Sequence, residues 1–175
     1  MKILSLRKCF VIVVLPFLMF VSCGGEPIPQ GMPKLYPAKV TIVQAGKKLD
    51  GATVTLYNND NPQSQWVVGG LTDSNGVCTL KTLGKFNGAP AGKYKVAVEK
   101  ITITGKVTSK QPDMSDTKAL EEYYEKKNNE KYYNNVNLKY KLLTTTDLEI
   151  EIITGKNEKT FDVGEPINEE IILVK

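Results

Sequence analysis

The stretch "GGLTDSNGVCTLKT", residues 69–82, decides the fold class. At its centre, Asp73-Ser74-Asn75-Gly76 is a turn signal, because Asp and Asn tolerate turn geometry and Gly76 can take a positive φ. The residues after the turn alternate between apolar and polar, which is the period of a strand with one buried face. The stretch therefore predicts a β-hairpin in which Cys78 and Leu80 point into a core.

Similar alternating runs occur on both sides of this hairpin. In "AKVTIVQ", residues 38–44, Val40 and Ile42 share one face, and "ATVTLYN", residues 52–58, repeats the pattern after a short predicted hairpin at Gly46–Gly51. Short β-rich runs separated by turn signals predict an antiparallel sandwich. Further predicted strands lie at 94–104, with Tyr94, Val96 and Val98 on one face, and at 148–153 and 158–163, joined by a turn at 154–157.

One segment breaks the β pattern. Residues 113–135, "DMSDTKALEEYYEKKNNEKYYNN", are helix-like, and Asp113 or Ser115 can cap the N-terminus. Leu120 and Tyr124 are four residues apart on a narrow apolar stripe, which predicts a surface helix of about three turns.

Four stretches in this order resemble bacterial transthyretin-like, or carboxypeptidase-regulatory-like, domains. The resemblance implies an all-β, antiparallel Greek-key β-sandwich of prealbumin or Ig-like type, with the helix as one inserted surface element. Such domains are common on exported proteins and mostly have no assigned activity. Tyr94 is then either a plain buried tyrosine or a tyrosine corner, whose hydroxyl bonds back to a nearby backbone group. The four stretches are "GATVTLY" (51–57), "GGLTDSNGVCTLKT" (69–82), "GAPAGKYKVAVEK" (88–100) and "LTTTDLEIEIITGKNEKTFDV" (143–163).

The N-terminus reads as an export signal. Basic residues precede an apolar run over 9–21 that is shorter than the roughly 20 residues of a membrane-spanning helix. Val21-Ser22-Cys23 resembles a bacterial lipobox, which implies cleavage before Cys23, lipid on its thiol and acylation of the new N-terminus. Gly24 in place of Asp implies, by the same resemblance, sorting to the outer membrane of a Gram-negative cell. The alternative is an ordinary cleaved signal with an accidental cysteine.

The predicted boundaries follow from these signals. "EPIPQGMPKLYP", residues 26–37, holds four prolines in twelve residues and predicts an extended tether. The predicted parts are a signal peptide at 1–22, a lipidated proline-rich tether at 23–37, the sandwich at 38–163 with its helical insertion at about 113–135, and a tail at 164–175 with an edge strand at Ile171–Val174.

Composition excludes several functions. The chain of 175 residues has a formal charge of +4, but the signal carries three of these charges and no acidic residue. The positive charge therefore does not indicate binding to nucleic acid. Only Cys78 remains as a thiol outside the signal and the lipobox, so no disulfide framework is predicted. There is no histidine, which excludes Ser-His or Cys-His catalysis and imidazole metal sites.

We therefore expect a lipid-anchored, extracytoplasmic, non-catalytic interaction or structural module of the cell envelope, without cofactor, whose partner is an envelope protein or a glycan. The main alternative is a module that binds carbohydrate or calcium. Trp66, Tyr123 and Tyr124 are the candidate ligand contacts, because aromatic faces stack on sugars, although the sequence favours packing roles for them over ligand contact. An enzyme is not expected: the related hydroxyisourate hydrolases use histidines and a terminal Tyr-Arg-Gly-Ser motif, and this chain ends in Ile-Leu-Val-Lys.

Overall fold

The chain divides into two compact units, residues 1–31 and residues 32–175, and the fold below belongs to the second unit. The predicted signal peptide and Cys23 lie outside the described residues, so the predictions made for them stay predictions. The computed structural model describes residues 27–61, 63–106 and 110–171.

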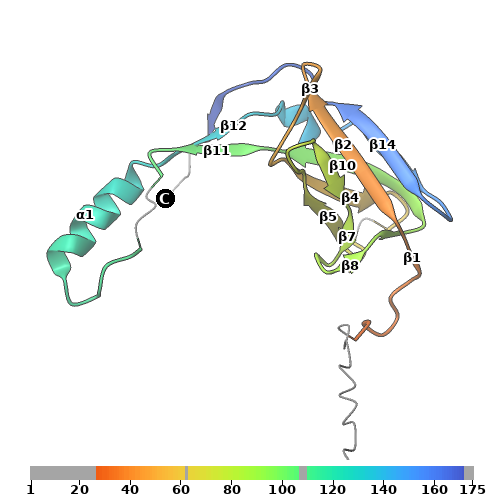
Figure 1. Cartoon of the computed structure of the whole chain (residues 1–175), viewed down its shortest axis with the longest axis horizontal. Helices are drawn as coiled ribbons and strands as arrows, with labels where there is room; N and C mark the ends of the chain where they lie inside the picture. The colour runs from red at the N-terminus through yellow and green to blue at the C-terminus, as the bar shows by residue number, and fades with distance from the viewer. Residues whose placement is uncertain (1–26, 62, 107–109, 172–175) are drawn as a thin grey trace, which may run out of the picture. The chain divides into compact units, whose positions relative to one another are not determined.

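The first sheet has six strands in the order β13-β10-β4-β5-β7-β8, and every neighbouring pair in it is antiparallel (Figure 1). Strand β10 is its longest element, and it pairs with β4 on one side and β13 on the other. The strands are β4 Thr53–Asn58, β5 Val68–Leu71, β7 Lys81–Thr82, β8 Phe86–Asn87, β10 Gly92–Glu99 and β13 Glu149–Ile152.

The second sheet has four strands and is centred on β2. Strand β2 pairs with β14 on one side and with both β3 and β6 on the other. The β2–β14 pair is parallel, whereas all other strand pairs described in the chain are antiparallel. The strands are β2 Ala38–Gln44, β3 Lys47–Lys48, β6 Val77–Thr79 and β14 Asn157–Asp162.

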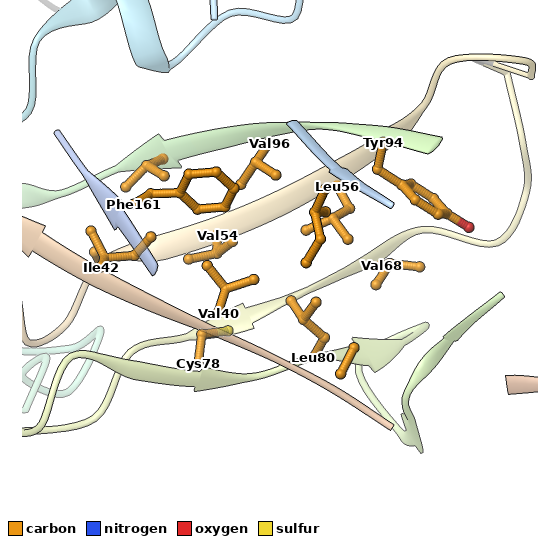
Figure 2. Packing of buried hydrophobic residues seen from close by; sticks show 14 of the residues in the cluster. Val40, Ile42, Val54, Leu56, Val68, Cys78, Leu80, Tyr94, Val96 and Phe161 are labelled. Atoms are coloured by element: carbon orange, nitrogen blue, oxygen red, sulfur yellow. The ribbon is translucent and has the colours of Figure 1, made fainter. Parts of the chain in front are cut away.

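The inner faces of the two sheets bury one apolar core (Figure 2). Alternate residues of each strand point into it, as the period-2 pattern predicted: Val40 and Ile42 on β2, and Val96 and Val98 on β10, are fully buried. Cys78 is also fully buried, as expected. The prediction of an all-β antiparallel sandwich with one inserted surface helix is therefore confirmed, with the parallel pair as its one departure among the described residues.

The predicted hairpins are partly wrong, because successive strands cross between sheets instead of pairing with each other. After β2, a tight turn pairs Val43 with Lys48 of β3 over a short length, and the chain then enters β4 in the other sheet. Likewise β13 and β14 lie in different sheets. A strand with one apolar face satisfies either sheet equally well, so alternation fixes the inward face but not the neighbour.

The Asp73–Gly76 turn forms, but its two arms also separate. Asp73 Oδ1 accepts hydrogen bonds from the backbone N–H groups of Asn75 and Val77, both at 2.9 Å, and Gly76 has φ +70°. After the turn, β6 joins β2 in the second sheet and β7 returns to β5 in the first. A Cβ on Gly76 would lie 2.5 Å from the carbonyl oxygen of Ile42, so glycine is needed here for space as well as for φ.

Tyr94 forms the tyrosine corner. Its hydroxyl donates to the carbonyl oxygen of Pro90 at 2.9 Å, and the side chain is 2% exposed. Burial raises the pKa of this phenol, and a hydrogen bond with the Asn58 side chain opposes the shift. The bond fixes the bend by which the chain enters β10.

Two boundaries of the predicted tether and tail need correction. Leu35–Tyr36 is a short strand, β1, which pairs with β9 (Ala89–Pro90), and Tyr36 packs against the core. Prolines at 33 and 37 lie on either side of this dipeptide, and the proline-rich composition led to the prediction of an unpaired tether. In the tail, β15 spans Glu169–Ile171 and is an edge strand, so it begins before the predicted Ile171; residues 172–175 lie outside the described part.

The predicted helical insertion is a helix followed by a strand. Helix α1 spans Thr117–Asn128, about the three turns expected, but β12 occupies Lys131–Asn134, which the helix prediction covered. The cap is Asp116, not Asp113 or Ser115: its Oδ1 accepts from Ala119 N–H at 3.0 Å. The β-prone sequence "KYYN" prefers the ladder that β11 (Ile101–Thr104) offers it.

Candidate functional site

Four elements form an appendage, here called the arm: β11, α1, β12 and β15. Their strands make a separate three-stranded antiparallel sheet in the order β11-β12-β15 (Figure 1). The residues of the hydrophobic core run from Ala38 to Val98 and resume at Val136, so none comes from the arm. The arm therefore adds surface to the protein without adding to its core.

The arm sheet has one apolar and one polar face. In the register of its strands, Ile103 lies opposite Tyr132, which lies opposite Ile171. Ile101 shares this face, because side chains two apart on a strand point the same way. Ile101 is 43% exposed and Ile103 is 36% exposed. Ile101 lies opposite Asn134, which is 1% exposed and lies opposite Glu169. The face is thus mostly apolar, and it is exposed along strand β11, which has no buried residue.

The opposite face of the arm sheet is polar. Thr102 lies opposite Tyr133, which lies opposite Glu170. Lys131 Nζ is 3.3 Å from Glu170 Oε1, in a salt bridge that solvent reaches on both sides. An exposed pair of this kind contributes little to stability, so the polar face serves mainly to keep one side of the sheet solvated.

Helix α1 also has no buried residue. Its two candidate contacts, Tyr123 and Tyr124, stand edge to face, with ring centroids 5.5 Å apart and ring planes at 81°. Tyr124 is 45% exposed and its hydroxyl accepts from Gln111 Nε2 at 3.0 Å, while Lys127 Nζ lies 5.8 Å from the Tyr123 ring centroid. Two rings at nearly a right angle do not make one flat platform, so at most one ring can stack on a planar ligand face.

Trp66 belongs to a different part of the molecule. It is half-buried in the loop before β5, and its backbone N–H donates a hydrogen bond to Ser64 Oγ at 3.2 Å. It lines a hollow of about 80 Å³ whose other lining residues all come from the segment 55–67. The structure therefore brings Tyr123 and Tyr124 together but does not join Trp66 to them, and a rim anchor is the role that its burial supports.

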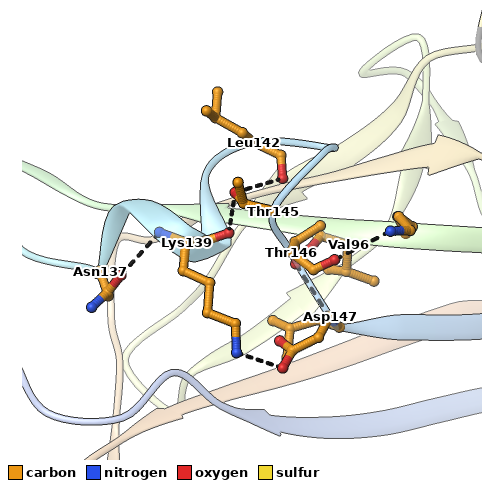
Figure 3. A network of polar contacts seen from close by, with 9 residues as sticks. Val96, Asn137, Lys139, Leu142, Thr145, Thr146 and Asp147 are labelled. Carbon is orange, nitrogen blue, oxygen red and sulfur yellow. Dashed lines mark hydrogen bonds and ion pairs between the residues drawn. The ribbon is translucent and has the colours of Figure 1, made fainter.

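The segment between the arm and β13 is fixed to β10 by polar contacts (Figure 3). Thr146 Oγ1 is buried and donates to the carbonyl oxygen of Val96 at 2.7 Å, and Thr145 Oγ1 donates to that of Lys139 at 2.7 Å. Lys139 also pairs with Asp147; this hydrogen bond lowers the pKa of Asp147 and raises that of Lys139. The segment that links β12 to β13 is thus held against strand β10 by specific hydrogen bonds.

A charged hollow of about 270 Å³ lies where β10, β13 and β14 meet. Lys93, Lys159, Glu149 and Glu151 line it together with Asn59, Tyr94 and Ile150. Lys159 Nζ donates to the backbone oxygen of Glu149, so one of its two lysines is already engaged. The mixture of both charge signs is typical of a solvated sheet edge, and it favours no ligand of a single charge.

Two polar loops, 58–61 and 73–76, hold one carboxylate each, which is too few for a calcium cage, and both use their oxygens internally. Asn58 Oδ1 accepts from the N–H groups of Asp60 and Asn61, and Asp73 Oδ1 closes the turn described above. No group of three or more Asp, Glu or Cys side chains within the described ranges is placed to hold a metal ion. Among the same residues, no helix is both long and apolar enough to cross a membrane.

The apolar face of the arm was missed as a candidate site. The run "KITITG", residues 100–105, was included in a predicted core strand, and its alternation is that of any half-buried strand. Only the pairing with β12 shows that Ile101 and Ile103 stay exposed in the described structure.

Comparison with known proteins assigns no family. No family model and no curated protein matches the chain. Two solved structures are similar in part: the major pilin subunit BcpA*(D312A) of Bacillus cereus, at 16% identity and a TM-score of 0.40 over 79% of this chain, and a 9R-lipoxygenase from Cyanothece PCC8801, at 14% identity and a TM-score of 0.36 over 80%. The alignments span 31% and 18% of those chains. Likeness at this level carries no argument about function.

Proposed function

We propose that this protein is a lipid-anchored, extracytoplasmic module of the cell envelope, of the transthyretin-like type, that acts by binding another envelope protein through its arm. The observation that carries the proposal is the arm itself: it leaves Ile101 and Ile103 exposed, and no residue of the arm enters the hydrophobic core. An element with no part in the core is free to present its surface to a partner.

The sandwich supports this function by rigidity. Its core is continuous across both sheets, and the buried Thr146–Val96 bond joins the root of the arm to the central strand β10. A surface held on a rigid scaffold loses less conformational entropy on binding than a mobile one. The lipobox and the proline-rich tether supply the proposed attachment to the membrane.

The anchor is tested by Cys23→Ala. We expect the variant to lose fatty-acid labelling and membrane retention, and Ser22→Ala, which keeps a small residue before the cysteine, to retain both. A Cys23→Ala protein that still incorporates labelled fatty acid would show that the lipobox interpretation is wrong.

The arm is tested by cross-linking in intact envelopes followed by capture of the protein. Replacing Ile101 and Ile103 together by Thr should remove cross-linked partners, because the change keeps β-branched side chains on β11 while it removes apolar surface. Leu71→Thr is the matched control, since Leu71 is 64% exposed on a strand of the sandwich. Equal recovery of partners from the arm variant and the control would contradict the proposal.

Carbohydrate binding is the second candidate, and the observation in its favour is the 45% exposure of Tyr124. A glycan array separates it from protein binding. A sugar-binding module would give a response that Tyr124→Ala abolishes and that Trp66→Phe leaves unchanged, because Trp66 lies in a separate hollow.

A further inference from the structure

We propose that the partner of the arm includes a second copy of this chain, with β11 of one copy lying beside β15 of the next, so that the arm sheets join edge to edge. This inference rests on the arm being the binding surface, as proposed above. It is more specific, since it names two strand edges and the residues that meet across them.

Both outer strands of the arm sheet have an unpaired side in the described structure. Strand β12 lies in the centre, and β11 and β15 each pair with β12 alone. The N–H of Asn135 donates to the carbonyl oxygen of Lys100 at 2.9 Å. The alternation of an antiparallel ladder therefore turns the backbone groups of Ile101 and Ile103 away from β12, toward the open side.

The same alternation sets the direction of β15. Because Tyr133 uses its backbone groups toward β11, the neighbouring Tyr132 and Asn134 use theirs toward β15. Glu170, which lies opposite Tyr133, then points its N–H and C=O outward. The two open edges thus present complementary backbone donors and acceptors to a following copy.

The two edges carry opposite charge. Lys100 and Lys106 flank β11, which itself holds only Ile and Thr, whereas β15 begins with Glu169 and Glu170. Each edge also carries an ion pair within its own chain: Glu99, beside Lys100, pairs with Lys141, and Glu170 pairs with Lys131. The Lys131–Glu170 pair is exposed and therefore weak, so Glu170 can exchange it for a lysine of a second copy. Opposite charges across an interface favour encounter and fix register, so β15 of a second copy suits the β11 edge better than a second β11 does.

The side chains also match when the edges meet. Strands β11 and β15 run parallel within one arm sheet, because each is antiparallel to β12, so copies related by a shift along the sheet pair them in parallel. The outward backbone of Glu170 then bonds between Ile101 and Ile103 of the next copy, which places Ile171 on the same face as those two isoleucines. On the polar face, Glu170 meets Thr102, with Lys100 of the next copy two residues away.

Strand β11 lacks the devices that usually protect an edge. It has no proline, no bulge and no charged residue in its four positions. A contact between two different edges leaves one edge of each kind free at the ends, so the assembly is open and grows with concentration. Short strands and exposed ion pairs make each contact weak and sensitive to salt.

The test is sedimentation velocity of the exported protein, purified in one mild detergent, over a range of protein and salt concentrations. We expect reversible association that high salt weakens. Lys100→Glu and Glu170→Lys should each weaken it roughly tenfold, because each puts like charges across the contact. Lys47→Glu is the matched control, since Lys47 is an exposed lysine on β3, an edge strand of the sandwich, and should leave association unchanged.

Mixing the two variants gives the sharpest result. In the mixture, both edges of each variant meet an edge of opposite charge on the other variant. The chain that carries both substitutions has edges that match in its own copies, so both the mixture and the double variant should regain association. Circular dichroism and thermal melts will show that the variants are folded.

Three outcomes would overturn the inference: a wild-type protein that stays monomeric at all concentrations, association that Lys47→Glu weakens as much as Lys100→Glu, or a loss in Lys100→Glu with none in Glu170→Lys. The last result indicates that Lys100 does not meet Glu170 across the contact. A monomeric wild type that still captures an envelope protein would leave the proposed function standing while this inference fails.

Discussion

Asn157 joins three parts of the sandwich, and its replacement by Ala tests how the fold closes. The side chain is 6% exposed at the start of β14. Its Oδ1 accepts from the N–H of Ile153 at 2.9 Å, and its Nδ2 lies 3.0 Å from the Ile153 oxygen, 3.1 Å from that of Gly155 and 3.2 Å from that of Pro37. The amide thus links the turn after β13 to the residue before β2.

The expected loss of stability follows from the number of hydrogen bonds that the Asn157 side chain can make. Nδ2 has two hydrogens for three acceptors, so the side chain makes the equivalent of about three hydrogen bonds. Each contributes about 1 kcal/mol net, so Asn157→Ala should lower the free energy of unfolding by roughly 3 kcal/mol. For a domain of this size that corresponds to a fall in Tm of roughly 6–12 °C.

Urea unfolding followed by circular dichroism measures the change, with Asn59→Ala as control because Asn59 is exposed; the control should lose less than about 0.5 kcal/mol. Asn157→Asp keeps the acceptor but turns a carboxylate toward three carbonyl oxygens. Its folded-state pKa should therefore be raised, so the variant should be most stable below about pH 4 and lose stability as pH rises. A loss below about 1 kcal/mol in Asn157→Ala would refute this account of the closure.

Three further predictions concern buried and exposed side chains. Burial, and secondarily the charge of Asp73, raise the pKa of Cys78 from 9.0 to about 11. The native thiol should therefore resist alkylation at pH 8, which peptide mapping measures. The stability that the protonated thiol contributes should be lost as pH rises from 9 through 11, which thermal melts at alkaline pH measure. Asn134 is 1% exposed, and neither polar atom of its side chain has a hydrogen-bond partner among the described residues. Asn134→Leu should therefore raise the free energy of unfolding in urea by about 1–3 kcal/mol, the cost of an unpaired buried amide; a decrease would show that the amide is satisfied in solution. Tyr124→Ala should change the free energy of unfolding by less than about 0.5 kcal/mol in urea, because Tyr124 is nearly half exposed and lies outside the hydrophobic core; a larger loss would mean that α1 is part of the cooperative fold.

The face of each core strand was predictable, because burial leaves a period of two in the residue types. Val40, Val54 and Val96 were assigned inward on that basis, and all are fully buried. The corner at Tyr94 was one of two readings that the sequence left open, and the hydroxyl bond to Pro90 decides between them. The turn at Asp73 was readable because its bonds are local to the chain.

Strand partners were not predictable in the same way. The sequence favoured hairpins between consecutive strands, whereas β2 pairs with β14, which is more than a hundred residues away. The strand at Lys131–Asn134 was hidden for a similar reason: its neighbours 101–104 and 169–171 are distant in the chain, and helix-forming residues precede it.

By itself, the sequence of this protein determined the class of the fold, the inward face of its strands and the closure of its local turns, because each of these depends on residues close together along the chain. Which sheet receives each strand, and which apolar face finds no second layer, were decided only in three dimensions. Val96 and Ile103 show the difference: both fall in the strand predicted over 94–104, but a second sheet covers Val96 while Ile103 stays exposed on the arm.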